Sequence, residues 1–200
     1  GGGRGPAAQT RAENAPGNRD DQCIGAAGVS LNTSNGSIIA MTQNTAFSET
    51  KTDDQAFTAL VFAGDKVHGN STGFPVGSTY KLFTLIDWLE KGHSVRETLN
   101  GAVQKNLKMN VCGGTQTVDT SEIGNFGGNR GYTSNVLNFT AQSLNSGYFA
   151  MAAKLDICDI NKVADRLGAT YGPREKVTDS NVPLDVLGPT HPSPLPLAAA

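Results

Sequence analysis

The chain has 200 residues, a length that fits one domain or a piece of a larger one. Lys and Arg number 16 and Asp and Glu 18, which gives a formal net charge of -2. This balance argues against a nucleic-acid-binding protein, because such proteins carry a basic surface. Hydrophobic residues make up 38% of the sequence, so the chain can build a core and is not disordered throughout.

The N-terminal quarter predicts an arm followed by a β-hairpin. Residues 1–21 are Gly-rich and polar without apolar periodicity, which indicates a linker or disordered arm, and the folded part is expected to begin at residue 22. Two apolar runs, near 24–31 and 37–43, flank an Asn-Gly pair and predict two strands joined by a tight turn. After a polar loop, residues 56–63 fit either a further strand or a short buried segment.

A central helix is expected after a loop rich in Gly, Asn, Ser and Pro. It begins near Ser78 and ends at Lys91-Gly92, where a cation and a residue that tolerates a left-handed conformation are typical of a helix end. Apolar residues fall on nearly every face of this segment, which predicts that it is buried at the centre of the domain.

The Gly-, Asn- and Thr-rich stretch that follows gives no clear prediction, but two further helices are expected beyond it. They cover about 141–155 and 160–167, the second with Asp159 as its N-cap and Gly168 beyond its end. Residues 195–200 predict the beginning of another helix.

Ser78 and Lys81 are the first candidates for chemistry. Residues i and i+3 of a helix share one face, so the amine of Lys81 can reach the hydroxyl of Ser78. Serine becomes a strong nucleophile when a base takes its proton, and a lysine can be that base if burial lowers its pKa toward neutrality. The alternative is a serine that caps the helix and a lysine on the surface, which this spacing alone does not exclude.

A second candidate is Ser143-Leu144-Asn145, near the start of the second predicted helix. The hydroxyl of Ser143 can relay a proton, and the amide of Asn145 can orient a substrate carbonyl or the lysine. Local helix capping is the alternative, because serine and asparagine compete well for hydrogen bonds at helix starts.

Other kinds of site find little support in the sequence. The three histidines are far apart and no spacing of metal ligands is present, so neither a metal nor a cofactor is expected. No stretch approaches the roughly 20 apolar residues of a membrane helix. The three cysteines, Cys23, Cys112 and Cys158, allow one disulfide with one leftover thiol, or three reduced thiols.

Five segments together form a family pattern. Residues 73–85 read Gly-Phe-Pro-Val-Gly-Ser-Thr-Tyr-Lys-Leu-Phe-Thr-Leu, which resembles the Pro-Gly-Ser-Thr-Phe-Lys-Pro-Phe-Thr-Leu signature of class A penicillin-binding proteins. Four more segments match that family in order: residues 35–41 (Gly-x-Ile-x-Ala-Met), 141–149 (Ser-x-Asn), 159–168 and 187–200. The resemblance covers about residues 22–200, and the loops and cysteines are most similar to the versions from actinobacteria.

The resemblance implies an α+β fold of the kind found in penicillin-binding proteins and serine β-lactamases, an antiparallel sheet flanked by helices that is incomplete in this chain. It also implies a D,D-transpeptidase that cross-links peptidoglycan stem peptides ending in D-Ala-D-Ala and is acylated by β-lactam antibiotics. Carried over to this sequence, Ser78 is the acylated nucleophile, Lys81 its general base, Ser143 a proton relay and Asn145 a contact to the substrate amide.

The implied location is the cell envelope, outside the cytoplasm, with an anchor to the cytoplasmic membrane in a segment absent from these residues. In that compartment Cys112 and Cys158 are expected to form a disulfide that joins the long loop to the helix junction, with Cys23 left free. Nucleic acid is not an expected partner.

One departure from the family is the absence of its Lys-Thr/Ser-Gly motif, since the only Lys-Thr pair here is Lys51-Thr52, in a predicted loop. In the family this motif lies on an inner strand further along the chain and supplies the second oxyanion donor. We therefore expect these 200 residues alone to be inactive, or active only when the remaining C-terminal part of the same domain completes the sheet. The glycosyltransferase domain of class A members is also absent.

The motifs leave other activities of the same fold open. A serine β-lactamase or a D,D-carboxypeptidase would pass the acyl group to water instead of an amine. A penicillin-sensing domain would keep the fold without catalysis.

Overall fold

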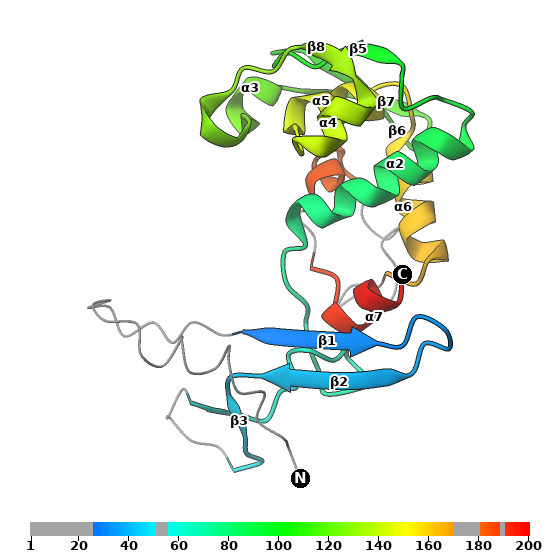
Figure 1. Cartoon of the computed structure of the whole chain (residues 1–200). Helices are drawn as coiled ribbons and strands as arrows, with labels where there is room; N and C mark the ends of the chain where they lie inside the picture. Colours follow the sequence, from blue (N-terminus) through cyan, green and yellow to red (C-terminus); the bar gives the residue numbers. More distant parts are fainter. Residues whose placement is uncertain (1–25, 51–55, 170–180, 189–190) are drawn as a thin grey trace.

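The computed structural model describes residues 26–50, 56–169, 181–188 and 191–200 (Figure 1). The predicted arm at residues 1–21 and Cys23 lie outside them. The strands are β1 (Ala27–Leu31), β2 (Ile38–Gln43), β3 (Ala46–Phe47), β4 (Phe57–Thr58), β5 (Thr98–Asn100), β6 (Leu107–Val111), β7 (Gly114–Val118) and β8 (Thr133–Asn135). The helices are α2 (Lys81–Glu90), α3 (Thr120–Ile123), α4 (Val136–Ala141), α5 (Asn145–Ala152), α6 (Ile157–Arg166) and α7 (Pro194–Ala199), with short 3₁₀ helices η1 (Gly77–Tyr80), η2 (Phe126–Gly128) and η4 (Pro183–Leu187).

The predicted N-terminal hairpin is confirmed. Strands β1 and β2 pair antiparallel, with Val29 opposite Met41. Their turn contains Gly36 at a positive φ of 72°, and the Gly36 N–H donates to the carbonyl of Asn32 at 2.8 Å. Helix α7 packs on β1, so the described C-terminal segment returns to the N-terminal hairpin (Figure 1).

The remaining strands form small sheets instead of one large one. Each sheet among the described residues has two strands, and the pairs β1–β2, β5–β8 and β6–β7 are antiparallel. The pair β3–β4 is parallel, and β4 occupies only two residues of the stretch predicted as a strand or buried segment. No helix in the described ranges has both the length and the hydrophobicity to cross a bilayer.

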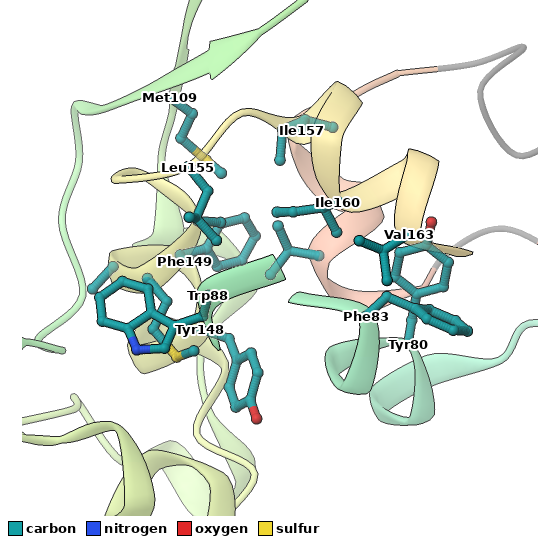
Figure 2. Close-up of a cluster of buried hydrophobic side chains, with 14 of the residues drawn as sticks. Tyr80, Phe83, Trp88, Met109, Tyr148, Phe149, Leu155, Ile157, Ile160 and Val163 are labelled. Carbon is teal, nitrogen blue, oxygen red and sulfur yellow. The ribbon is translucent and has the colours of Figure 1, made fainter. Parts of the chain in front are cut away.

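The hydrophobic core lies where α2 packs against α5 and α6 (Figure 2). Phe83 and Trp88 of α2, Phe149 of α5 and Ile160 of α6 are each 0–1% exposed. Helix α2 lies in this core, as predicted, although Leu82 and Leu89 keep about half of their surface exposed. The described helices cover only one side of α2.

A buried polar chain fixes the N-terminal end of α2. The hydroxyl of Tyr80 donates to Oδ1 of Asn161 at 2.6 Å, and Nδ2 of Asn161 donates to Oδ2 of Asp185 at 2.8 Å. Burial raises the pKa of Asp185 above its ordinary value. The Gly77 N–H donates to the carbonyl of Gly188 at 3.0 Å. A side chain at Gly188, whose φ is 65°, would put its Cβ 2.5 Å from the Gly77 carbonyl oxygen, so this close approach requires glycine.

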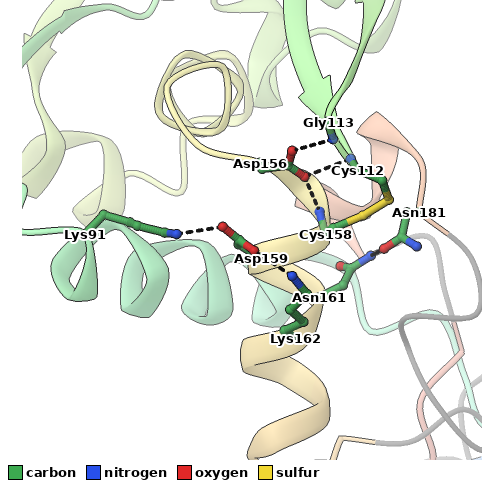
Figure 3. A network of polar contacts seen from close by, with 9 residues as sticks. All are labelled: Lys91, Cys112, Gly113, Asp156, Cys158, Asp159, Asn161, Lys162 and Asn181. Carbon is green, nitrogen blue, oxygen red and sulfur yellow. Dashed lines mark hydrogen bonds and ion pairs between the residues drawn. A yellow bond between two sulfur atoms is a disulfide. The ribbon is translucent and has the colours of Figure 1, made fainter.

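Two helix boundaries differ from the sequence prediction. The helix expected over about 141–155 is the shorter α5, and a turn at residues 142–144 separates it from the preceding helix α4, which the sequence did not predict. Helix α6 begins at Ile157, and its N-cap is Asp156 in place of the predicted Asp159. Asp159 lies in the first turn instead, where it pairs with Lys91 and Lys162 at 2.6 and 2.9 Å (Figure 3).

Asp156 is the better cap because it also holds the β6–β7 hairpin. Its carboxylate accepts hydrogen bonds from the backbone N–H groups of Cys112, Gly113 and Cys158 at 2.8–3.0 Å (Figure 3). These three bonds favour the charged form and lower the pKa of Asp156 although partial burial raises it. The same two segments are joined by the predicted disulfide between Cys112 and Cys158.

Removing the disulfide is expected to lower the free energy of unfolding. The bond closes a loop between residues 46 apart in sequence, so the Cys112→Ala/Cys158→Ala double variant should lose about 2–4 kcal/mol. Urea unfolding followed by circular dichroism measures the loss, with Cys23→Ser as the matched control that should leave the stability unchanged. If the intact mass without reductant shows no loss of two hydrogen atoms, the disulfide is absent.

Candidate active site

Ser78 lies in the 3₁₀ turn η1 that leads into α2, and its side chain is exposed. The turn follows from Gly77, whose φ of 56° is a conformation that other residues rarely adopt. Ser78 does not cap this turn, because the N-cap position is occupied by Val76 without a side-chain hydrogen bond. The hydroxyl of Ser78 is therefore accessible from solvent at the start of the central helix.

Lys81, the first residue of α2, is 3% exposed. Its Nζ donates to the Ser78 Oγ at 3.1 Å, to the Ser143 carbonyl at 2.7 Å and to the Ser143 Oγ at 3.0 Å. It also donates to Oδ1 of Asn145 at 2.7 Å. The structure thus brings together all four residues singled out in the sequence, and the alternative of a surface lysine does not hold.

The surroundings of Lys81 favour its neutral form. Its hydrogen-bond acceptors are hydroxyl, carbonyl and amide oxygens, all uncharged. Burial lowers the pKa of Lys81 from its ordinary 10.5 to about 8, because removing an ammonium from water disfavours its charge. A lysine with this pKa can act as a base near neutral pH.

Ser143 reaches Lys81 because of an unusual backbone conformation. It has a φ of 48°, which is uncommon for a residue with a side chain and is often found at functional sites. Serine at this position lies in the turn between α4 and α5, where its N–H donates to the Thr140 carbonyl at 3.1 Å. In this conformation both its carbonyl and its hydroxyl oxygen face the Lys81 amine.

Asn145 is held from both ends of its amide. Oδ1 accepts from Lys81, while Nδ2 donates to the Gly124 carbonyl at 3.0 Å, in the loop after α3. Of the two roles considered from the sequence, the described geometry therefore matches the orientation of the lysine. The Nδ2 group is already occupied by the protein itself.

A cavity of about 300 Å³ opens beside these residues. It is bordered by Ser78, Lys81 and Ser143 together with residues that the sequence analysis did not single out. These are Thr79, Leu82, Leu85, Thr140 and Tyr148. Tyr148 lies three residues after Asn145 in α5, so helical spacing is the signal that could have placed the two on one face.

The described residues hold no cluster of three or more His, Cys, Asp or Glu side chains suited to a metal ion. Two histidines are engaged elsewhere: His68 pairs with Asp65, and His93 stacks on Trp88 and contacts Glu97. The site therefore resembles a serine–lysine arrangement and differs from a serine–histidine one.

The buried amine of Lys81 should make stability depend on pH. Between pH 8 and 10.5 the folded chain has begun to release this proton while the unfolded chain still binds it, so the free energy of unfolding rises with pH in this window. The Lys81→Met substitution removes this pH-dependent contribution to the free energy of unfolding. Urea unfolding of both proteins from about pH 7 to about pH 10 should give a difference that grows in favour of the parent chain; parallel curves would show that Lys81 titrates as an exposed lysine.

Comparison with known proteins gives structural matches alone, since neither a family model nor a curated protein matches the sequence. The penicillin-binding protein PonA1 from Mycobacterium tuberculosis is 21% identical, with a TM-score of 0.57 over 86% of this chain and 39% of that chain. The same protein in complex with penicillin V gives 20% identity and a TM-score of 0.59 over 86% of this chain and 40% of that chain. This chain spans about two fifths of the solved chains. The similarity confirms the expected fold class: the chain has the α+β fold of penicillin-binding proteins.

Proposed function

We propose that this chain belongs to the penicillin-binding proteins and that residues 22–200 are the N-terminal and central part of a peptidoglycan D,D-transpeptidase domain. The observation that carries the proposal is the buried Lys81 amine, within hydrogen-bond distance of Ser78, Ser143 and Asn145. The fold shared with a protein solved in complex with penicillin V supports it.

Lys81 is the general base in this proposal. A neutral amine has two N–H bonds and one lone pair. The two shortest contacts of Nζ, both 2.7 Å, lead to the Ser143 carbonyl and to Asn145 Oδ1, and neither oxygen can give a proton back. When both N–H bonds are directed there, the lone pair is left for the hydroxyl proton of Ser78, 3.1 Å away.

The reaction is an acyl transfer in two steps. Ser78 Oγ bonds to the carbonyl carbon of the penultimate D-Ala while its proton passes to Lys81, the C–N bond to the terminal D-Ala breaks, and the leaving nitrogen takes a proton through the hydroxyl of Ser143. Ser143 Oγ is 3.0 Å from Nζ, a suitable distance for this relay. An amine of a neighbouring strand then attacks the ester carbonyl carbon and forms the new C–N bond, the C–O bond to Ser78 breaks, and Lys81 takes a proton from the amine and returns one to Ser78 Oγ.

Asn145 both orients Lys81 and contacts the substrate in this scheme. Its Oδ1 already accepts from the amine, and the second lone pair of an amide oxygen can accept a substrate N–H. A β-lactam follows the same first step, but its leaving nitrogen remains attached, so that the serine stays acylated.

The proposed cellular location is the cell envelope. The proposed substrate, a peptidoglycan stem peptide, lies outside the cytoplasm, and the Cys112–Cys158 disulfide is typical of proteins in oxidising compartments. Attachment to the cytoplasmic membrane through a segment outside these residues is part of the same proposal.

These 200 residues by themselves should react slowly. Backbone N–H groups at the start of η1 and α2 can stabilise one side of an oxyanion, but the Lys-Thr/Ser-Gly segment that supplies the second donor in the family is absent from the sequence. Loss of one such donor reduces rates by about 10²–10³-fold.

Prolonged incubation with penicillin V tests the proposal. Intact-mass spectrometry should detect one added penicillin on Ser78, formed about 10²–10³-fold more slowly than on a complete transpeptidase domain. The Ser78→Ala variant should take up none. Residues 48–51 form a second Ser-x-x-Lys sequence, so Ser48→Ala is the matched control and should react like the parent chain.

Each other outcome rejects a distinct part of the proposal. Uptake by Ser78→Ala, or none by the parent chain, would reject the serine acyl-enzyme. Fast stoichiometric uptake would reject the expectation that these residues are nearly inactive alone. Rapid release of hydrolysed penicillin would replace the transpeptidase by a β-lactamase.

A further inference from the structure

The aromatic ring of Tyr148 faces the Lys81 amine, as the other three site residues do. Lys81 Nζ lies over this ring, 5.4 Å from its centroid. Tyr148 is 2% exposed and borders the cavity beside Ser78. Its place within the buried cluster is visible in Figure 2. An ammonium within about 6 Å of an aromatic face is attracted by the ring quadrupole, more strongly when both are removed from water.

The ring is fixed in this position by a directed hydrogen bond. The Tyr148 hydroxyl lies 2.9 Å from Thr140 Oγ1, and Thr140 Oγ1 itself donates to the Val136 carbonyl at 2.9 Å. Because threonine has a single hydroxyl proton, Tyr148 must be the donor. The phenol is therefore neutral, and burial raises the pKa of Tyr148 above its ordinary value.

We infer, on the basis of the proposed function, that Tyr148 is a positioning residue whose ring stabilises the ammonium that Lys81 becomes when it takes the proton of Ser78. The neutral amine gains little from the ring, whereas the ammonium gains a cation–π interaction. The ring therefore favours the charge-separated state that follows proton transfer. Above about pH 8, where Lys81 is mostly neutral at rest, this interaction is made only in that state and increases the rate.

The other groups around Lys81 are uncharged, so the Tyr148 ring is the group that distinguishes the ammonium from the neutral amine. The Lys81 amine contacts the Ser78 hydroxyl of η1 and the two oxygens of Ser143 in the α4–α5 turn. From α5 it contacts Asn145 and the ring of Tyr148. Tyr148 is the titratable side chain in this set, and no carboxylate of the described residues contacts Nζ. A new positive charge on Lys81 thus meets neutral dipoles and one aromatic face.

The decisive measurement is the titration of Lys81 in the ¹³C-lysine-labelled 200-residue chain, followed by the ¹³Cε chemical shift and assigned with Lys81→Met. Tyr148→Phe keeps the ring and should keep the pKa of Lys81. Trifluorophenylalanine in place of Tyr148 keeps the ring's shape but weakens its quadrupole, and should lower the pKa by about half a unit to one and a half units. Tyr148→Leu should lower it similarly where the variant folds.

The outcomes separate this inference from the proposed function, because the readout does not require penicillin. A pKa that falls with fluorination supports the ring's role whether or not Ser78 is acylated. Equal pKa values in the Phe and trifluorophenylalanine proteins overturn it, even if Ser78 is acylated normally. Where acylation is measurable above about pH 8, with Lys81 mostly neutral at rest, its rate should fall by about three- to thirty-fold with the fluorinated ring, and a rate unchanged by fluorination under these conditions also counts against the inference.

Discussion

The arrangement of the site depends on one buried amine. Lys81 is removed from water and keeps its hydrogen bonds only because Ser143 and Asn145, 62 and 64 residues further along the chain, supply oxygens to it. A buried amine without such partners would be strongly destabilising. Helix α2, the α4–α5 turn and the start of α5 must therefore be held in register, and the hydrophobic core that α2 shares with α5 and α6 holds them.

The N-terminal end of α2 needs its own support, because Ser78 is exposed. The Tyr80–Asn161–Asp185 chain supplies this support from the buried side, between the positions of the serine and the lysine. It joins η1 to α6 and η4, while the Gly77–Gly188 hydrogen bond fixes the backbone just before Ser78. The Ser78 hydroxyl is thus carried on a turn fixed from both sides, as an oriented nucleophile requires.

The sequence was sufficient where local chemistry decides the structure. Asn-Gly predicted the β1–β2 turn, and helical spacing put Ser78 and Lys81 on one face. It was insufficient where tertiary contacts decide. Asp156 is preferred to Asp159 as a cap because Cys112 and Gly113 of a distant hairpin also donate to it. The break between α4 and α5 rests on a serine with positive φ, a conformation that sequence normally signals with glycine.

The same distinction explains why Tyr148 was not found from the sequence, although the four polar residues of the site were. A serine or a lysine in a motif carries its chemistry in its residue type, whereas a tyrosine in an apolar helix is in most cases part of the core. Its effect depends on which side chain lies over its face. Here that side chain is an amine whose other partners are all uncharged, and a carboxylate in their place would raise the pKa of Lys81 and keep it protonated. An aromatic face, by contrast, can favour the transient ammonium without holding a full negative charge against it.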